Sequence, residues 1–330
     1  MLTKDDEAIR WLLKKDQPSI RYLTLRDLLG KTESDSEVKQ TRENITRVGW
    51  AKDILESQAP EGYWVKERSL FQPKYTATFW MILVLSDLGL TKEDHRVDKA
   101  AQLWMNHSQT MDGGFEDHNC NAKEGHLCIT GNTARALVKF GYEDHPKTRS
   151  AFRWLVENQA EKGGWSCWNF GGRHTGRDLD SWEPLSAFAV YPRQKWTRSM
   201  KLAVERAAEF YLERELHILP KGERYGPWYR FHYPNHYYYD LLVGLNVMTA
   251  LGYSNDKRLG FALSLLKKKR RSDGRWNLDA TNPDPESGQA RWDRAHPTKA
   301  SIHFALETAR KPSKMITLTA LKVLNRIEDS

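Results

Sequence analysis

Residues 118 to 128, HNCNAKEGHLC, contain two of the three cysteines and two of the eleven histidines in the chain. Thiolate and imidazole groups are the usual ligands of zinc, and a catalytic zinc keeps three protein ligands with one position open. Cys128, Cys167 and either His126 or His174 could supply such a set. The spacing fits no compact zinc module, however. In the alternative interpretation Cys128 is a small buried apolar residue and the histidines are polar loop groups.

Carboxyl groups form a second candidate site in GRDLDSWEPLSAF, residues 176 to 188. Asp178, Asp180 and Glu183 lie within six residues, and neighbouring carboxylates can hold a proton for acid catalysis because each disfavours ionisation of the other. Asp240 is a further acidic candidate. In the alternative interpretation the aspartates and Ser181 are helix caps, and Glu183 belongs to a first helical turn.

Aromatic side chains are concentrated in WYRFHYPNHYYYD, residues 228 to 240. Aromatic faces could stabilise a carbocation or stack on a sugar ring, or they could wedge the loop against its neighbours. We favour the lining of a cavity. The candidate substrate-binding residues are Arg21, Tyr22, Tyr75, Trp165, Trp182, His236, Tyr238 and Tyr239.

A repeated phrase, Gln followed by a Gly-aromatic turn, indicates the elements that position these residues. Its copies end at Trp64, Phe115, Trp165, Trp228 and Trp276, about 50 residues apart for most pairs; the copy at Trp228 is degenerate, and the last two copies lack the Gln. A helix with one charged face precedes each phrase, and a helix that is apolar nearly all round follows it. The helix with one charged face should expose that face to solvent, and the helix that is apolar nearly all round should be buried.

This pattern predicts an all-α fold, a single (α/α)6 toroid of six outer–inner helix pairs over residues 1–330. The inner helices are expected to begin near Ser19, Tyr75, Cys128, Ser181, Tyr238 and Ser313. Their N-termini would meet at one mouth of a central cavity, where free N–H groups attract anions. We therefore expect the site at that mouth.

The phrases QTMDGGF and QAEKGGW resemble the QW repeats of the terpenoid cyclase and protein prenyltransferase toroids, and the resemblance covers nearly the whole chain. It implies zinc at His126 and Cys128, because prenyltransferase β subunits ligate zinc with Asp-x-Cys at an inner helix, although their third His ligand has no clear match here. It implies that Asp180 protonates an alkene, because class II terpene cyclases use the middle Asp of Asp-x-Asp-Asp. Ser181 replaces the last Asp of that motif.

The resemblance implies an enzyme that acts on an isoprenoid or other apolar ligand in the central cavity. Two alternatives stay open: a toroid that binds a ligand without catalysis, and a carbohydrate-active (α/α)6 enzyme. In the latter, Asp178, Asp180, Glu183 and Asp240 would supply the acid and the base.

The net charge of +8 favours a small anionic ligand or peripheral contact with an acidic membrane surface. No nucleic-acid partner is expected, because RNA-binding signatures are absent. No apolar run reaches the ~18 residues of a membrane span, and the start, MLTKDDEAIRWLL, has acidic residues where a signal peptide needs basic ones. We expect a cytoplasmic monomer with zinc as its one candidate cofactor.

Overall fold

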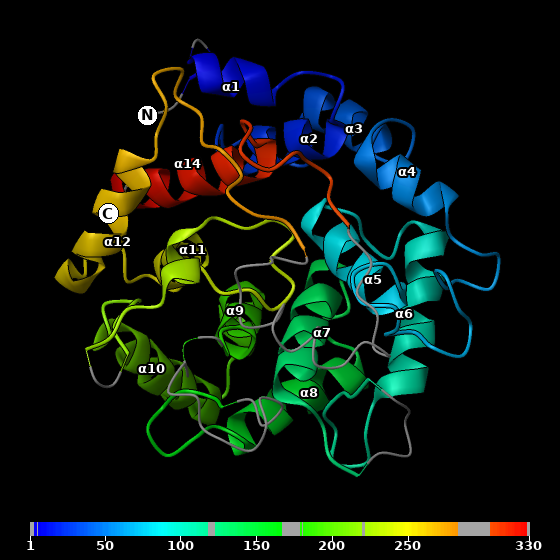
Figure 1. The fold of residues 1–330 in the computed structure, drawn as a ribbon. Coiled ribbons are helices and arrows are strands. Elements are labelled where there is room, and N and C mark those ends of the chain that lie inside the picture. The colour runs from blue at the N-terminus through cyan, green and yellow to red at the C-terminus, as the bar shows by residue number, and fades with distance from the viewer. Residues whose placement is uncertain are drawn as a thin grey trace.

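The computed structural model describes residues 3–4, 6–117, 123–166, 179, 181–219, 222–282 and 304–328. Helices form all the regular structure in these ranges, and extended pairing is limited to isolated bridges. Figure 1 shows the helices arranged as a ring around a centre. The predicted all-α toroid is therefore confirmed.

Six inner helices surround the centre of the ring (Figure 1). They are α2 (Pro18–Asp27), α5 (Thr78–Asp87), α7 (Leu127–Lys139), α9 (Glu183–Val190), α11 (Leu241–Ala250) and α14 (Lys314–Glu328). Helix α5 contacts α7, and contacts continue in chain order through α9, α11 and α14 back to α2. Each inner helix begins within three residues of its predicted start.

Outer helices precede the inner ones along the chain. They are α1 (Glu7–Leu12), α4 (Trp50–Glu56), α6 (His95–Ser108), α8 (Pro146–Glu157), α10 (Arg198–Leu212) and α12 (Gly260–Lys268). Short 3-10 turns span Arg193–Lys195, Gly226–Tyr229 and Lys257–Leu259. The sequence pattern missed one helix, α3 (Ser36–Glu43), which packs on α2 and whose N-terminus is capped by the Asp35 carboxylate.

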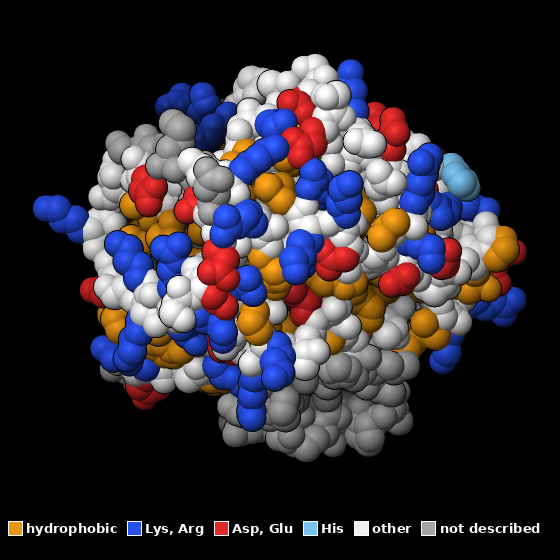
Figure 2. Space-filling model, turned by 90° about the horizontal axis from the view of Figure 1, so that it is seen from above, with side chains coloured by type: hydrophobic (Ala, Val, Ile, Leu, Met, Phe, Trp, Pro, Cys, Tyr) orange, Lys and Arg blue, Asp and Glu red, His pale blue; other side chains and the backbone are white. Residues whose placement is uncertain are grey.

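Burial explains why the two kinds of helix differ in sequence. Helix α5 buries nine consecutive residues, Thr78 to Ser86, because it is packed on all sides. Helix α8 buries only one stripe, which includes Phe152, Trp154 and Leu155. Figure 2 shows one flank of the ring, where Lys and Arg side chains are interspersed with Asp and Glu. No helix in the described ranges is both long and apolar enough to span a bilayer.

In the copies of the phrase that contain it, the Gln residue links the turn to the next outer helix. Gln58 donates its amide N–H to the carbonyls of Gly62 in its own turn and Arg96 in α6, at 3.1 and 3.0 Å. Gln159 repeats this arrangement with Gly163 and with Ala203 in α10, at 2.6 and 2.7 Å. A side-chain amide offers two donors, so one residue can fix a turn and a neighbouring helix together.

The aromatic residue of the phrase has an equally structural role. The indole N–H donates to a carbonyl of the preceding outer helix at 2.8 Å for Trp64, 2.9 Å for Trp165 and 2.8 Å for Trp276. Because these rings are almost fully buried, the bond satisfies a donor that would otherwise be left unpaired. The repeat therefore holds the outer layer in place.

Candidate functional site

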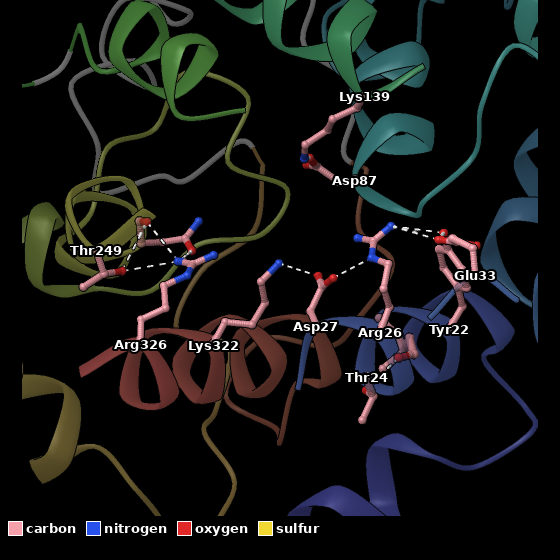
Figure 3. Close-up of polar contacts among 12 residues, drawn as sticks. Tyr22, Thr24, Arg26, Asp27, Glu33, Asp87, Lys139, Thr249, Lys322 and Arg326 are labelled. Atoms are coloured by element: carbon pink, nitrogen blue, oxygen red, sulfur yellow. Dashed lines mark hydrogen bonds and ion pairs between the residues drawn. The ribbon is translucent and has the colours of Figure 1, made fainter. Parts of the chain in front are cut away.

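A cavity of about 330 Å³ lies between the inner helices. It is bounded mainly by their C-terminal halves, whereas the sequence predicted a site at the N-terminal mouth. Figure 3 shows side chains from α2, α5, α7, α11 and α14 converging on this space. The charged residues that line it are Arg26, Asp27, Asp87, Arg135, Lys139, Asp240, Lys322 and Arg326.

An ion cluster on α5 and α7 forms one wall of the cavity. The Asp87 carboxylate lies 2.6 Å from Lys139 Nζ and 3.6 Å from Arg135 Nη1. Burial alone would raise the pKa of Asp87, but Lys139 and Arg135 hold this pKa below its ordinary value. Asp87 therefore stays ionised and orients both cations.

A second ion cluster on α2 and α14 faces the first (Figure 3). Asp27 accepts from Arg26 Nε and Lys322 Nζ, both at 2.6 Å. Burial opposes ionisation of Asp27, yet the two cations lower its pKa to about 2. On the same helix as Lys322, Arg326 donates to the Asn246 side chain at 2.9 Å.

Cations outnumber carboxyl groups in the cavity lining. The lining contains five cationic side chains and three carboxyl groups, those of Asp27, Asp87 and Asp240. Burial lowers the pKa of Lys139 and of Lys322, and the positive charge of Lys322 lowers the pKa of Lys139 further. The two clusters thus repel each other electrostatically, and a bound anion would relieve this repulsion.

Asp240 places a third carboxyl group in the lining of the cavity, as the N-cap of α11. It accepts from the backbone N–H groups of Val243 and His232, both at 2.8 Å. Burial raises the pKa of Asp240 to about 6, although His232 and these hydrogen bonds oppose the shift. The capping role is therefore observed. A carboxyl group in a cavity that titrates near neutrality is also a candidate general acid.

Three buried donors in the cavity lining have no hydrogen-bond partner among the described residues. They are Arg135 Nε, Trp182 Nε1 and the Tyr233 hydroxyl. The exposed fractions of these residues are 9%, 3% and 4%. An unpaired buried donor costs about 1–3 kcal/mol of stability. The fold keeps these three donors unpaired despite this cost. Unpaired donors on residues that line the same cavity as several cations are typical of a ligand site.

Three of the residues predicted from the sequence line this cavity, namely Tyr22, Trp182 and Asp240. The Tyr22 hydroxyl donates to Glu33 at 2.6 Å and accepts from Arg26 at 3.0 Å. The Arg135 guanidinium lies over the Trp182 ring, 5.2 Å from its centroid. Trp182 thus positions a cation in the lining of the cavity.

The other predicted binding residues lie outside this lining. Arg21 joins α2 to α3 through the Glu37 carboxylate at 2.5 Å. Trp165 is the structural indole described above, and Tyr239 donates to the carbonyl of Leu216 at 2.9 Å.

Tyr75, His236 and Tyr238 form a buried aromatic group. Tyr75 stacks on His236 with ring centroids 5.5 Å apart, and its hydroxyl lies 3.1 Å from that of Tyr238. Burial lowers the pKa of His236 to about 3, so the ring is neutral at physiological pH. Both Tyr75 and His236 have positive φ, at 74° and 47°, a conformation that L-residues rarely adopt.

The predicted zinc ligands are only partly within the described residues. His126 Nδ1 lies 3.2 Å from Cys128 Sγ at the start of α7. Cys167 and His174 lie outside the described residues, and the described ones contain no group of three potential ligands. A pair falls short of the three protein ligands of a catalytic zinc, so zinc stays a prediction.

The predicted acid pair Asp178 and Asp180 also lies outside the described residues. Glu183 is fully buried as the first residue of α9 and is not among the residues that line the cavity. Of the four predicted catalytic carboxyl groups, the structure therefore brings only Asp240 to the cavity.

The sequence interpretation missed the charges on the inner helices. Asp27, Asp87 and Lys139 are each the last residue of an inner helix, two or three positions before the Gly that ends the turn. A charged residue at the same position of several nearly apolar helices is a signal that could have located the cavity, because a buried charge needs a partner.

Comparison with known proteins identifies the fold. No protein-family model matches the sequence, and no curated protein sequence matches it. A family 105 glycoside hydrolase from C. acetobutylicum ATCC 824 has a similar structure, with a TM-score of 0.50, 14% identity, and coverage of 98% of this chain and 100% of that chain.

Two further solved structures resemble the chain. An unsaturated glucuronyl hydrolase specific for heparin has a TM-score of 0.50 and 9% identity, over 96% of this chain and 86% of its own. The type II terpene cyclase MstE from Scytonema has a TM-score of 0.47 and 14% identity, over 95% and 88%. The two hydrolases share the α/α-toroid fold with this chain, and identities this low show the fold alone.

Proposed function

We propose that the protein binds a small polar molecule with a negative charge, of the class of sugar acids or sugar phosphates, in the cavity between its inner helices. The observation that carries this proposal is the excess of cationic side chains over carboxyl groups in the lining of this cavity. A volume of about 330 Å³ falls at the lower end of the range for small-molecule sites.

The charged lining supports a carbohydrate-type ligand over an isoprenoid one. An isoprenoid chain has no polar group with which to satisfy the cations and unpaired donors of the lining, and contact with them would add a desolvation cost. A sugar ring carries hydroxyl groups that can accept and donate, and its apolar face can pack on an aromatic ring such as Trp182. One structure with the same fold is an unsaturated glucuronyl hydrolase specific for heparin, so the fold is compatible with this class.

Acid catalysis on this ligand is a second proposal, favoured by Asp240. Burial raises the pKa of Asp240 to about 6, whereas the cations around Asp87 lower the pKa of that carboxyl group. Two carboxyl groups with pKa values pushed apart suit an acid and a base. In such a hydrolysis Asp240 would donate a proton to the leaving oxygen, while a water molecule would give a proton to the ionised Asp87 and add to the other fragment.

The interpretations that the sequence left open are retained as proposals of lower rank. A non-catalytic toroid would bind the same ligands without turnover. An isoprenoid substrate is another such interpretation, and the affinity for geranylgeranyl diphosphate tests it. A monomeric state, a cytoplasmic location and peripheral membrane contact stay predictions from the sequence.

A binding titration tests the proposal. D-glucuronate and glucose 6-phosphate are expected to bind and to raise the melting temperature, whereas neutral glucose and geranylgeranyl diphosphate are expected to bind at least tenfold more weakly. The absence of binding by both sugar anions would overturn the proposal, and tighter binding of the isoprenoid diphosphate would favour the sequence-based expectation.

A matched pair of variants separates the cavity from general charge. Lys322→Gln removes a cation that lies 2.6 Å from Asp27 in the cavity, and binding of glucuronate should weaken roughly tenfold. Lys269→Gln removes the same charge from an outer position, where Lys269 lies 2.7 Å from Asp279. This control variant should bind glucuronate as the wild type does, and equal losses in both variants would contradict a cavity site.

A further inference from the structure

We infer that the anionic group of the ligand is an oxyanion, a carboxylate or a phosphate, held by Arg135 Nε, Trp182 Nε1 and the Tyr233 hydroxyl. This inference rests on the proposed function. It adds the position and chemistry of the anchoring subsite. The three residues that carry these donors come from separate parts of the chain and line one cavity, and the buried donor atoms have no partner among the described residues.

The Arg135 guanidinium is fixed by its other contacts. Nη2 donates to Asn132 Oδ1 at 3.1 Å, and Nη1 lies 3.6 Å from the Asp87 carboxylate. The Trp182 ring lies against the group with its centroid 5.2 Å from the guanidinium carbon. The Nε–H is therefore an unused donor on a side chain that is already oriented.

Trp182 is unusual among the buried tryptophans of the chain. Besides the three indoles of the repeat, Trp80 donates to the Phe71 carbonyl at 2.8 Å and Trp104 donates to Thr133 Oγ1 at 2.9 Å. Trp182 is 3% exposed, yet its N–H has no acceptor among the described residues. Since the sequence satisfies the other buried indoles, the unpaired one marks a place where an external acceptor belongs.

Tyr233 completes the set from the loop before α11. Burial raises the pKa of Tyr233 well above its ordinary value, and the negative charge of Asp87 adds to this shift. The hydroxyl therefore stays protonated and can donate. An indole and a guanidinium have N–H groups but no acceptor, so the subsite selects a group rich in lone pairs. A carboxylate or phosphate meets that requirement, and a neutral hydroxyl meets it poorly.

The position of the subsite also orients the rest of the ligand. Arg135 belongs to the ion cluster on α5 and α7, together with Asp87 and Lys139. A ligand anchored there extends towards the opposite cluster on α2 and α14, where Arg26 and Lys322 flank Asp27. The ligand class that fits is therefore a sugar-sized molecule with its oxyanion at one end.

Removal of one hydroxyl tests the subsite with two readouts. Tyr233→Phe deletes an unpaired donor, so the melting temperature of the ligand-free protein should rise or stay unchanged. Its affinity for D-glucuronate and for inorganic phosphate should fall roughly ten- to a hundredfold, as expected for loss of a hydrogen bond to a charged group.

Tyr211→Phe is the matched control. The Tyr211 hydroxyl is buried on an outer helix and donates to the Leu179 carbonyl at 3.1 Å. This variant should melt at a lower temperature and bind glucuronate as the wild type does. Arg135→Lys, which keeps the charge but loses Nε, should weaken binding as Tyr233→Phe does.

The possible outcomes separate this inference from the proposed function. If the wild type binds glucuronate and Tyr233→Phe and Arg135→Lys bind it equally well, the subsite is overturned and the proposed function stands. If the wild type binds neither glucuronate nor phosphate, both are overturned. A melting temperature lowered by Tyr233→Phe as much as by Tyr211→Phe would contradict the unpaired state of the hydroxyl, whatever the binding result.

Discussion

Replacement of Asp240 by Asn should change how stability depends on pH. Burial raises the pKa of Asp240 from 3.8 to about 6 in the folded protein, so the folded state binds a proton more tightly than the unfolded chain does. The stability that this group contributes is therefore fully present below pH 3.8 and is lost as the pH rises through 6. The amide side chain of the Asp240→Asn variant has no such titration.

The expected size of this effect follows from the two pKa values. Between pH 5 and pH 8 the wild type should lose about 1.4 kcal/mol of unfolding free energy relative to Asp240→Asn. The variant also loses one of the two acceptors for the backbone of His232 and Val243, a cost of about 1–3 kcal/mol that is independent of pH in this window.

Urea denaturation of both proteins at pH 5, 6, 7 and 8 measures the difference. The gap in unfolding free energy between wild type and variant should narrow as the pH rises from 5, mostly below pH 6, and should be nearly constant between pH 7 and 8. Parallel curves across this range would refute the reasoning, because they would mean that the Asp240 carboxyl has an ordinary pKa. A gap that widens with pH would mean that the surrounding hydrogen bonds outweigh burial.

Two further predictions concern an ion pair in the cavity wall and the close contact between α7 and α9. Asp87→Asn removes the counter-ion of Lys139, so unfolding free energy should fall by about 2 kcal/mol in urea denaturation, while glucuronate affinity should rise several-fold in a titration because the cavity becomes more positive. A variant that loses glucuronate affinity as well as unfolding free energy would contradict this account. Gly131→Ala should lower unfolding free energy by about 2 kcal/mol or more, because a Cβ there would lie 2.6 Å from the backbone of the first turn of α9. Gly260→Ala, with nothing within 4 Å of its Cβ, should be neutral or slightly stabilising in the same measurement.

The ring of paired helices could be predicted because burial imposes a period on the sequence. Helix α5 is apolar along its whole length and α8 along one stripe, and this contrast is visible without a structure. The repeated Gln was recognised as part of a motif, but its bond to the next outer helix joins Gln58 to Arg96 and could not be derived from local spacing. Helix α3 was missed because it stands outside the repeat.

The cavity could not be located from the sequence, for a different physical reason. A charged residue such as Asp27 reads as the solvated end of a helix, and only the three-dimensional ring shows that Lys322 reaches it from 295 positions away. The unpaired state of Trp182 and Tyr233 depends in the same way on which acceptors the fold does not supply. Composition suggested an anionic partner, whereas the cavity that we propose for it becomes visible only in the folded chain.

The contact between α2 and α14 has a consequence for the order of events during synthesis. The N-terminal helices leave the ribosome first, and contacts of such large sequence separation form late in folding. Asp27 can therefore pair with Lys322 only after α14 has been made. The cavity is therefore completed late in folding. A ligand that contacted both of its walls would stabilise the closed ring, because it would bind only the completed cavity. Removal of α14 would take Lys322 and Arg326 out of the cavity lining, even though the helix pairs from α4 to α10 would still have their neighbours.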